Sequence, residues 1–308
     1  MQEYLLKDAL KKGYAVGAFN FGTLEVLKGI IASAELASAP VIAQVSEGAI
    51  KFMGDEYLKQ IIVAARKECK VPISFHLDHG TSFESVKKAI EIGFDSVMID
   101  ASMLPFEDNI AITKNVVDYA HEKGVFVEAE LGSLAGVEDN IAVADDKSCF
   151  TNPSQAKEFV ERTGVDSLAI AIGTKHGAYK FGGEAKLRFD ILDEIEKEIP
   201  NTPLVLHGAS GVDSTAVTRL LELGVDITGA KGIPDEFLQQ ASKRHICKIN
   251  GDTDLRIALL IGILHNVEQN TKNIDYRKYL TEGMAEITAL CKGKHEIYGS
   301  ANQAKIKE

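Results

Sequence analysis

An apolar stretch that ends in an acid and a histidine, Ile73–Gly80, holds the first residues that could do chemistry. Side chains alternate along a strand, so His76 and Asp78 share one face, while His79 lies at or past the strand end, where it can turn toward a site. A carboxylate and an imidazole at such a point suggest a proton-transfer group beside a metal ligand. The competing interpretation is a pair of satisfied surface residues.

Two more histidines, His176 and His207, also follow apolar runs. If the three runs are strands of one closed sheet, three neutral imidazoles meet at one rim and leave an open position on a tetrahedral zinc ion, as catalytic zinc sites do. A single histidine at a strand end is more often a hydrogen-bonded neighbour than a ligand, but three together favour a metal centre. We expect His76 to orient these ligands. The remaining histidines are expected at helix surfaces: His121, His245, His265 and His295.

Acidic residues at three other places could take part in metal binding or proton transfer. Asp100 and Glu130 end neighbouring runs and could hold a second cation or orient the first ligands, although a helix cap or an ion pair explains them equally well. The segment from Gly132 to Asn152 has small residues and no clear periodicity, which is typical of a mobile active-site lid. Glu138 would then be a base delivered on closure. Otherwise the segment is a solvated acidic loop.

The elements that must position these residues alternate between two patterns. Short apolar runs rich in β-branched residues predict eight strands: Ala15–Asn20, Val41–Ser46, Ile73–Asp78, Ser96–Ala101, Phe126–Leu131, Ser167–Gly173, Leu204–Gly208 and Cys247–Asn250. Amphipathic stretches predict helices between them: Thr23–Ala37, Glu56–Glu68, Phe83–Ile92, Glu107–Lys123, Pro153–Thr163, Phe189–Lys197 and Ser214–Leu223. Repeated strand–helix units most economically close into an α/β fold, the (β/α)8 TIM barrel, with catalytic loops at the carboxyl ends of the strands. An open doubly wound sheet normally has a Gly-rich turn after its first strand, and Asn20–Thr23 lacks one.

Small and polar residues follow the seventh and eighth expected strands, where barrels most often seat a phosphate. The run Gly208–Asp213 leads into a helical pattern whose free backbone N–H groups favour an anion. The run Asn250–Arg256 is also small and polar and ends in a cation. Lys180 and Arg256 could hold a second phosphate, or they could be solvated charges.

Length, charge and cysteine spacing exclude several classes of protein. The chain of 308 residues has a formal net charge of −11 and no lysine- or arginine-rich run, so neither a nucleic-acid partner nor an anionic membrane is expected. The four cysteines form no C-x-x-C pair, which argues against a structural zinc knot or a disulfide framework. The amino terminus lacks a signal-peptide pattern, and the longest apolar run, Ile257–Leu264, is too short to cross a bilayer. We expect a cytoplasmic protein with one barrel domain over residues 1–308, including a helical extension from about 254 to 308.

Five motifs follow one another in the sequence, within a similarity that extends from about Gly17 to Ala301: His76-Leu77-Asp78-His79-Gly80, Glu128-Ala129-Glu130-Leu131-Gly132, Gly173-Thr174-Lys175-His176-Gly177-Ala178-Tyr179, Leu206-His207-Gly208-Ala209-Ser210-Gly211 and Lys248-Ile249-Asn250-Gly251-Asp252-Thr253-Asp254. Together they resemble the motifs of the class II, zinc-dependent fructose-1,6-bisphosphate aldolases. The resemblance implies a glycolytic lyase that reversibly cleaves fructose 1,6-bisphosphate to dihydroxyacetone phosphate and glyceraldehyde 3-phosphate.

The resemblance also implies a role for each matching residue. His79, His176 and His207 would bind the catalytic zinc, and Asp100 and Glu130 match the second metal position. Asp78 would exchange the proton on the C4 oxygen, and Glu138 would move the proton at C3 of dihydroxyacetone phosphate. The remaining substrate contacts would be Asn20, Ser46, Gly177, Lys180, Gly208, Ala209, Ser210, Asn250, Asp252, Thr253, Arg256 and Arg277.

Within this set, Lys180 and Arg256 would hold the distal phosphate. Arg277 resembles an arginine contributed by the adjoining subunit, which implies a homodimer or a homotetramer. The backbone around Gly177 and Gly208 matches a monovalent-cation site, for Na⁺ or K⁺. In the implied chemistry the zinc ion stabilises an enediolate, so no Schiff-base lysine is required.

Two departures and three alternatives bear on the resemblance. Ala209 stands where many members have Gly, and Val137 precedes Glu138 where some have a second Glu. Tagatose-1,6-bisphosphate aldolases belong to the same family, but their last motif usually lacks the Asp252–Asp254 pattern, which favours fructose. A zinc hydrolase on this fold commonly has His-x-His on its first strand, and Gly17–Asn20 has none. A catalytically idle sugar-phosphate-binding barrel would be expected to have lost Asp78 or a zinc histidine.

Overall fold

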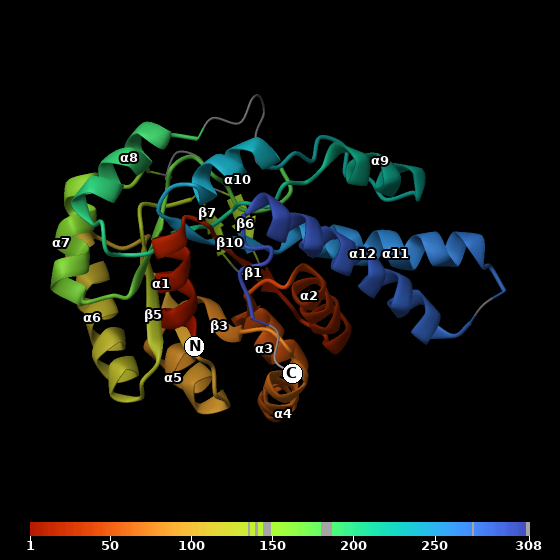
Figure 1. Ribbon diagram of the computed structural model, residues 1–308, viewed down its shortest axis with the longest axis horizontal. Helices are drawn as coiled ribbons and strands as arrows, with labels where there is room; N and C mark the ends of the chain where they lie inside the picture. Colours follow the sequence, from red (N-terminus) through yellow and green to blue (C-terminus); the bar gives the residue numbers. More distant parts are fainter. Residues whose placement is uncertain (135, 139–140, 144–148, 180–186, 273, 306–308) are drawn as a thin grey trace.

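Eight parallel strands close into a barrel in the computed structural model, which confirms the predicted (β/α)8 TIM barrel (Figure 1). The structure describes residues 1–134, 136–138, 141–143, 149–179, 187–272 and 274–305. Around the barrel the strand order is β1-β10-β9-β8-β5-β4-β3-β2. The strands are β1 (Val16–Asn20), β2 (Val41–Ser46), β3 (Ile73–Gly80), β4 (Ser96–Ile99), β5 (Phe126–Leu131), β8 (Ser167–Ile170), β9 (Leu204–Leu206) and β10 (Ile246–Gly251).

The expected irregular segment between Gly132 and Asn152 contains a short antiparallel hairpin, β6 (Gly136–Glu138) and β7 (Ile141–Val143). Its base is closed by Ser133 and Cys149, whose backbones exchange two hydrogen bonds of 3.0 and 3.1 Å. The hairpin begins directly over a candidate metal ligand, because a Cβ on Gly136 would lie 2.4 Å from the backbone oxygen of His176. Only glycine fits there, so the segment is tied to the site at this point.

Several helices begin after a residue whose side chain caps the first turn, for example Ser82 before α5 and Asn152 before α7. Three helices lie outside the predicted elements, namely α1, α3 and α10. The helices are α1 (Gln2–Lys12), α2 (Leu24–Ala37), α3 (Glu47–Met53), α4 (Asp55–Glu68), α5 (Phe83–Ile92), α6 (Phe106–Glu122), α7 (Pro153–Thr163), α8 (Phe189–Glu198), α9 (Ser214–Glu222), α10 (Asp235–Ser242), α11 (Thr253–Gln269) and α12 (Tyr276–Ile297). None of these helices, within the described part of the chain, is long and apolar enough to cross a membrane.

Helix α1 closes the amino-terminal end of the barrel. Its Gln2 side chain is fully buried, and Gln2 Oε1 accepts hydrogen bonds from the hydroxyl of Ser74, at 3.1 Å, and from that of Ser96. Both serines lie at the start of their strands, β3 and β4. The amide therefore satisfies hydrogen-bonding groups on the barrel floor, where Ser96 Oγ also lies 2.7 Å from His76 Nδ1.

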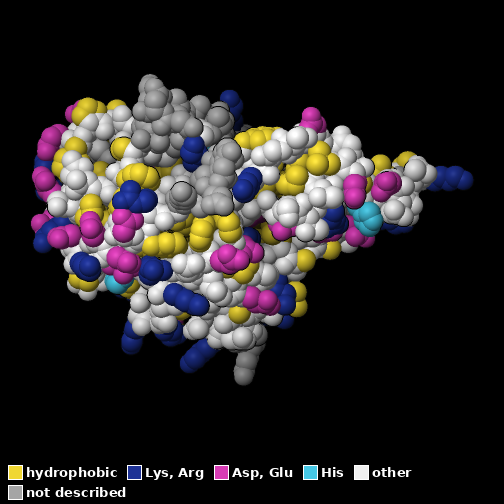
Figure 2. Space-filling view, turned by 90° about the horizontal axis from the view of Figure 1, so that it is seen from above, with side chains coloured by type: hydrophobic (Ala, Val, Ile, Leu, Met, Phe, Trp, Pro, Cys, Tyr) yellow, Lys and Arg dark blue, Asp and Glu magenta, His cyan; other side chains and the backbone are white. Residues whose placement is uncertain are grey.

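Helices α11 and α12 lie side by side and form an arm that projects from one side of the barrel (Figure 1). They approach closely because a Cβ on Gly262 would lie 2.6 Å from the backbone of Glu282. Figure 2 shows apolar side chains gathered where the arm joins the barrel. Near the tip, Ile274 and Tyr276 are 93% and 69% exposed. The arm therefore presents apolar side chains to the surroundings.

His295, near the end of α12, corrects one expectation: it is fully buried rather than at the surface. Its ring meets Phe19 of β1 edge to face with centroids 5.5 Å apart, and its Nδ1 bonds to the Ser300 hydroxyl at 3.0 Å. The sequence pattern did not show this because the end of α12 packs across the first strand of the barrel. His121 and His265 are exposed as expected, and His245 is half-buried.

Burial of His295 should make folding stability depend on pH. Burial lowers the pKa of His295 from 6.5 to about 4, so between these values the unfolded chain binds the proton more tightly. Stability is then full above pH 6.5 and falls as the pH drops toward 4, with a loss of about 2 kcal/mol at pH 5. Urea unfolding of the wild type and of His295→Gln at pH 7 and pH 5 measures this difference. The loss of stability between pH 7 and pH 5 should be smaller in His295→Gln than in the wild type, and it should be unchanged in exposed His265→Gln. Equal losses in the two variants would contradict the assignment of this pH dependence to His295.

Candidate active site and metal centre

The three histidines predicted as metal ligands come together at the carboxyl ends of β3, β8 and β9. The ring centroids of His79 and His207 are 4.6 Å apart, those of His79 and His176 are 5.1 Å apart, and those of His176 and His207 are 6.4 Å apart. Imidazoles around a tetrahedral zinc with Zn–N bonds of about 2.0 Å would have centroids roughly 5 Å apart. The distances from His79 to the other two rings fit one shared ion, whereas the 6.4 Å between His176 and His207 is longer. The ligand atoms found within 4.8 Å of one another are those of Asp78, His79 and His207, and this group does not include His176.

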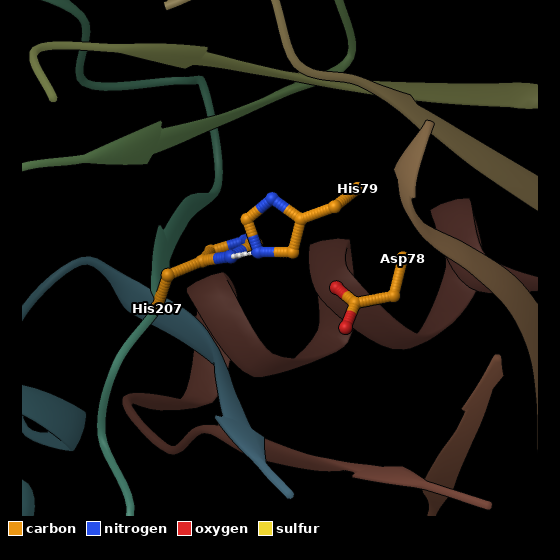
Figure 3. Close-up of side chains that lie close together, drawn as sticks. All are labelled: Asp78, His79 and His207. Carbon is orange, nitrogen blue, oxygen red and sulfur yellow. Dashed lines mark hydrogen bonds between the residues drawn. The ribbon is translucent and has the colours of Figure 1, made fainter. Parts of the chain in front are cut away.

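A backbone irregularity aims two consecutive residues, Asp78 and His79, into the same space. Strand β3 runs to Gly80, beyond its expected end at Asp78, and its pairing with β4 shifts register between Leu77 and Gly80. His79 sits in the left-handed region with φ 49°, which is uncommon for a residue other than glycine. Neighbours in a regular strand point to opposite faces, whereas here both side chains point toward His207 (Figure 3).

Carboxylates fix which ring nitrogens face the centre. His79 Nδ1 lies 3.1 Å from Asp100 Oδ2, and His207 Nε2 lies 2.8 Å from Glu128 Oε1. The opposite nitrogens, His79 Nε2 and His207 Nδ1, face each other at 2.9 Å (Figure 3). If both outer nitrogens donate to their carboxylates, two lone pairs meet at this distance, and a cation between them is the natural partner. Asp100 thus takes the orienting role that we considered for it.

The protonation states around the centre suit metal binding. Burial raises the pKa of Asp100, but hydrogen bonds from His79 and Ser102 outweigh it and hold that pKa below its usual value. Burial likewise raises the pKa of Glu128, but the charge of Lys248 and the hydrogen bond to His207 lower it overall. Burial lowers the pKa of His207, so its ring is neutral at pH 7 as a ligand must be.

A second group of ligand atoms lies beside the first. Side-chain atoms of Asp78, His79 and His207 lie within 4.8 Å of one another, and so do those of His79, Asp100 and Glu130. The two groups share His79. The geometry is therefore compatible with the second metal position predicted for Asp100 and Glu130.

Two amides hold the carboxylate of Asp78. Asn20 Nδ2 donates to Asp78 Oδ2 at 2.8 Å, and Asn250 Nδ2 donates to Asp78 Oδ1 at 3.1 Å. Gln44 Nε2 in turn donates to Asn20 Oδ1 at 2.7 Å, so it orients the amide. Sequence reasoning did not assign Gln44 a role, although a polar side chain near the end of an apolar strand was a usable signal. The arrangement fixes a carboxylate that can exchange a proton next to the metal centre.

The phosphate loop predicted after β9 is tightly packed. Gly208 has φ 60°, and a Cβ there would lie 2.7 Å from the backbone of Lys175. Ala209 and Ser210, the next two residues, are buried. Ala209 does not have a positive φ, so its methyl group causes no backbone strain at this position.

A cavity of about 520 Å³ lies at the ends of β1, β2 and β10. It is lined by four predicted substrate contacts, Asn20, Ser46, Asp252 and Arg256. Arg256 is held by Asp252 through contacts of 2.7 and 3.0 Å. The predicted contacts Asn20 and Asn250 thus converge on Asp78, while Ser46, Asp252 and Arg256 surround the adjoining space.

Three predicted residues are not placed in this centre. Lys180 and the side chain of Glu138 lie outside the described residues, although Glu138 belongs to the hairpin strand β6. Arg277 begins α12 on the arm, where Asp275 binds its guanidinium through two contacts of 2.9 Å.

A fully buried ion pair lies beneath the metal centre. Lys248 Nζ is 3.1 and 3.0 Å from the two carboxylate oxygens of Glu128, whose Oε2 is also 3.6 Å from His76 Nε2. Lys248, Glu128 and His76 each lie two positions before a residue of the site, namely Asn250, Glu130 and Asp78. Residues two apart in a strand share a face, so both members of each pair point into the barrel, from β10, β5 and β3. The three earlier residues therefore form a lower polar layer in the barrel. No role was assigned to Lys248 or Glu128 from the sequence. Glu128 and Glu130 lie two positions apart in an apolar strand, and this spacing was a signal that both carboxylates share its inward face. The expected orienting role of His76 stays a prediction, and the contact that links it to a ligand is its approach to Glu128, whose Oε1 bonds to His207.

Replacing Lys248 by methionine should destabilise the fold by about 3–5 kcal/mol, because Glu128 would be left as a buried charge without its cation. Urea unfolding of the metal-loaded protein measures the loss. The control is Lys157→Met, whose ammonium group lies 3.4 Å from Glu198 on the surface and should contribute less than about 1 kcal/mol. Equal losses in the two variants would contradict the importance of the buried pair.

The fold and the site define a class: a (β/α)8-barrel enzyme with a histidine–carboxylate metal centre at the carboxyl ends of its strands. The model of the family described as fructose-bisphosphate aldolase class-II matches residues 2–228 and 227–303. The chain belongs to this family of aldolases.

Individual relatives are similar to this chain in sequence over almost its whole length. Fructose-bisphosphate aldolase of Helicobacter pylori strain 26695 is 45% identical over 302 residues, which cover 98% of each chain. That of Thermus caldophilus is 45% identical over 300 residues, covering 97% of this chain and 98% of the relative. The crystal structure of the YdjI aldolase from Escherichia coli K12 superposes with a TM-score of 0.81 at 33% identity and covers 99% of both chains.

Proposed function

We propose that the protein binds zinc through His79, His176 and His207 and reversibly cleaves fructose 1,6-bisphosphate in glycolysis and gluconeogenesis. The observation that supports this best is the pair of imidazole nitrogens that face each other at 2.9 Å, each ring fixed by a carboxylate, beside Asp78. When bound, the ion supplies an electrophile that stabilises negative charge as it develops on the substrate.

The chain's own residues then divide the remaining work. Asp78, held by Asn20 and Asn250, removes the proton from the C4 hydroxyl in the cleavage direction and returns it in synthesis. Glu138, carried by the β6–β7 hairpin, exchanges the proton at C3 of dihydroxyacetone phosphate. A hairpin that closes over the site would also exclude water from the reacting carbon atoms.

The two phosphates have different proposed sites. The backbone and side chains after β9 and β10 hold the phosphate of dihydroxyacetone phosphate: Gly177, Gly208, Ala209, Ser210, Asn250, Asp252 and Thr253. Lys180 and Arg256 are proposed to hold the other, distal phosphate, and Ser46 is proposed as a further substrate contact. A monovalent cation, Na⁺ or K⁺, is proposed beside the backbone of Gly177 and Gly208.

We also propose a homodimer or homotetramer, in which Arg277 reaches the site of an adjoining subunit. Its side chain is 77% exposed, and its arm carries the exposed Ile274 and Tyr276. A shared interface would cover these apolar side chains, and sedimentation of the purified protein tests it. A glycolytic role places the enzyme in the cytoplasm, which fits the lack of a membrane-spanning helix in the described chain.

Release of triose phosphates from fructose 1,6-bisphosphate tests the proposed activity. Tagatose 1,6-bisphosphate serves as the second substrate, and free phosphate is measured in parallel. We expect trioses from both sugars, with the higher kcat/KM for fructose 1,6-bisphosphate. A higher value for the tagatose compound would reverse the substrate assignment, and phosphate release without trioses would indicate a hydrolase.

A further inference from the structure

The loop that follows β9 is held by two residues of the arm that have no role in the reaction described above. Asp254, in the first turn of α11, is buried, and its two oxygens accept hydrogen bonds from the backbone N–H groups of Gly211 and Val212, both at 2.7 Å. These donors are 43 and 42 residues away in the sequence. Charge-assisted bonds of this kind are stronger than those between neutral groups.

The loop needs such a restraint because its conformation is strained. Val212 has φ 40°, a left-handed conformation that is a genuine outlier for a β-branched residue. Its side chain is buried with Ile257 and Ile261 of α11. A backbone in this region persists only when its surroundings hold it there.

The loop is packed closely at Gly208–Ser210, but at Gly211 and Val212 it borders a cavity of about 720 Å³. Gly211, Val212, Asp254, Ile257 and Lys294 are among the residues that line this space. The two bonds from Asp254 therefore restrain the loop beside a space that side chains do not fill.

Lys294, near the end of α12, completes the support. Its Nζ donates to Asp235 at 2.8 Å and lies 3.8 Å from Asp254 Oδ2. Burial lowers the pKa of Lys294, but the neighbouring Tyr298, Asp254 and Asp235 outweigh it and raise that pKa overall, so the ammonium group is charged at pH 7. It also touches the loop, because a Cβ on Gly211 would lie 2.8 Å from Nζ.

We propose that Asp254 and Lys294 are positioning residues that hold the loop Gly208–Val212 in its phosphate-binding conformation and couple that loop to the arm. The inference rests on the proposed function, in which this loop binds the phosphate of dihydroxyacetone phosphate. Asp254 lies at the base of α11 and Lys294 at the base of α12, while Arg277 lies toward the tip. A displacement of the arm therefore changes the geometry of the loop on the same chain.

Asp254→Asn tests the holding role directly, because an amide keeps the shape but loses one acceptor and the charge. We expect backbone amides of residues 208–213 to exchange with deuterium about tenfold faster, since each lost bond to a charged group weakens the local closed state. The KM for fructose 1,6-bisphosphate should rise about tenfold, with a smaller change in kcat and unchanged zinc content. Lys294→Met should change both measurements in the same direction by a smaller factor, and it serves alone if Asp254→Asn does not fold.

The matched control is Asp95→Asn. Asp95 also accepts a backbone hydrogen bond, from Phe75 at 2.8 Å, and also pairs with a cation, Arg66 at 2.9 Å, but at the amino-terminal end of the barrel. Exchange of residues 208–213 and KM should match the wild type in this variant.

Three outcomes would each contradict a different part of the proposal or of the proposed function. Unchanged exchange of the loop in both arm variants would overturn the holding role. Faster exchange with unchanged KM would overturn the link between the loop and phosphate binding. Failure of the wild type to cleave the sugar would refute the proposed function, while the exchange measurements would still decide whether the arm holds the loop.

Discussion

Removal of the metal ion by a chelator should lower the rate of triose release by at least about a thousandfold, since electrostatic stabilisation of the developing charge is usually the largest catalytic contribution. In the described site, His79 and His207 present ligand atoms to one point beside Asp78, and the proposed zinc set adds His176 to them. The measurement is cleavage of fructose 1,6-bisphosphate by dialysed protein, followed by addition of Zn²⁺, Co²⁺ or Fe²⁺ in turn.

Restoration by at least one of these ions is part of the expected result, and circular dichroism of the dialysed protein shows whether the barrel has stayed folded. Full activity in protein that holds far less than one metal ion per chain would contradict the metal mechanism. Metal-free protein should also unfold at a lower temperature than loaded protein, because the ion binds the native state.

Asp78→Ala should lower kcat by roughly 10²–10⁴-fold, the usual contribution of general acid–base catalysis, and should leave the metal content unchanged. The carboxylate is held by Asn20 and Asn250, which places it beside the ligands as a separate proton-transfer group. Metal analysis and steady-state kinetics on one preparation test both halves of the statement.

Metal content is decisive because Asp78 also lies within 4.8 Å of ligand atoms of His79 and His207. Loss of the ion together with activity in Asp78→Ala would show that Asp78 is itself a ligand. The control is Gln44→Ala, which removes only the support of Asn20 and should lower kcat much less. Equal losses in the two variants would contradict the role of Asp78 in proton transfer.

Much of the fold could be predicted from the sequence because a buried parallel strand leaves a local trace. Val41–Ser46 and Phe126–Leu131 have the predicted bounds, and so do the helices Phe83–Ile92 and Pro153–Thr163. Polar residues directly after apolar strands also indicated the rim of the barrel. The three histidines could be grouped before any coordinates because a closed barrel brings the ends of its strands together.

What could not be predicted depends on contacts between distant segments. The left-handed backbone of His79 follows from a register shift against β4, not from the residues around it. Lys248 reads as an ordinary charge until the barrel closes and places it against Glu128. Burial of His295 likewise arises from the packing of α12 on β1.

The hydrogen bonds from Asp254 to Gly211 and Val212 show the same limit. A carboxylate that binds backbone groups more than forty residues away leaves no pattern in either segment. From the sequence, Asp254 could be recognised only as part of the motif Lys248–Asp254. Gly211 and Val212 could be recognised only as part of a turn rich in small residues.

The contacts of helix α1 at the amino-terminal end of the barrel influence the metal centre at the carboxyl-terminal end. Loss of the residues around Gln2, by proteolysis, would remove the contacts of that amide with Ser74, Ser96 and His76 and would let water approach His76, which lies next to the pair of Lys248 and Glu128. Hydration would weaken the attraction between these charges, and Glu128 would then orient His207 less firmly. Preparations that differ only in their amino-terminal residues could thus differ in how tightly they retain the metal ion.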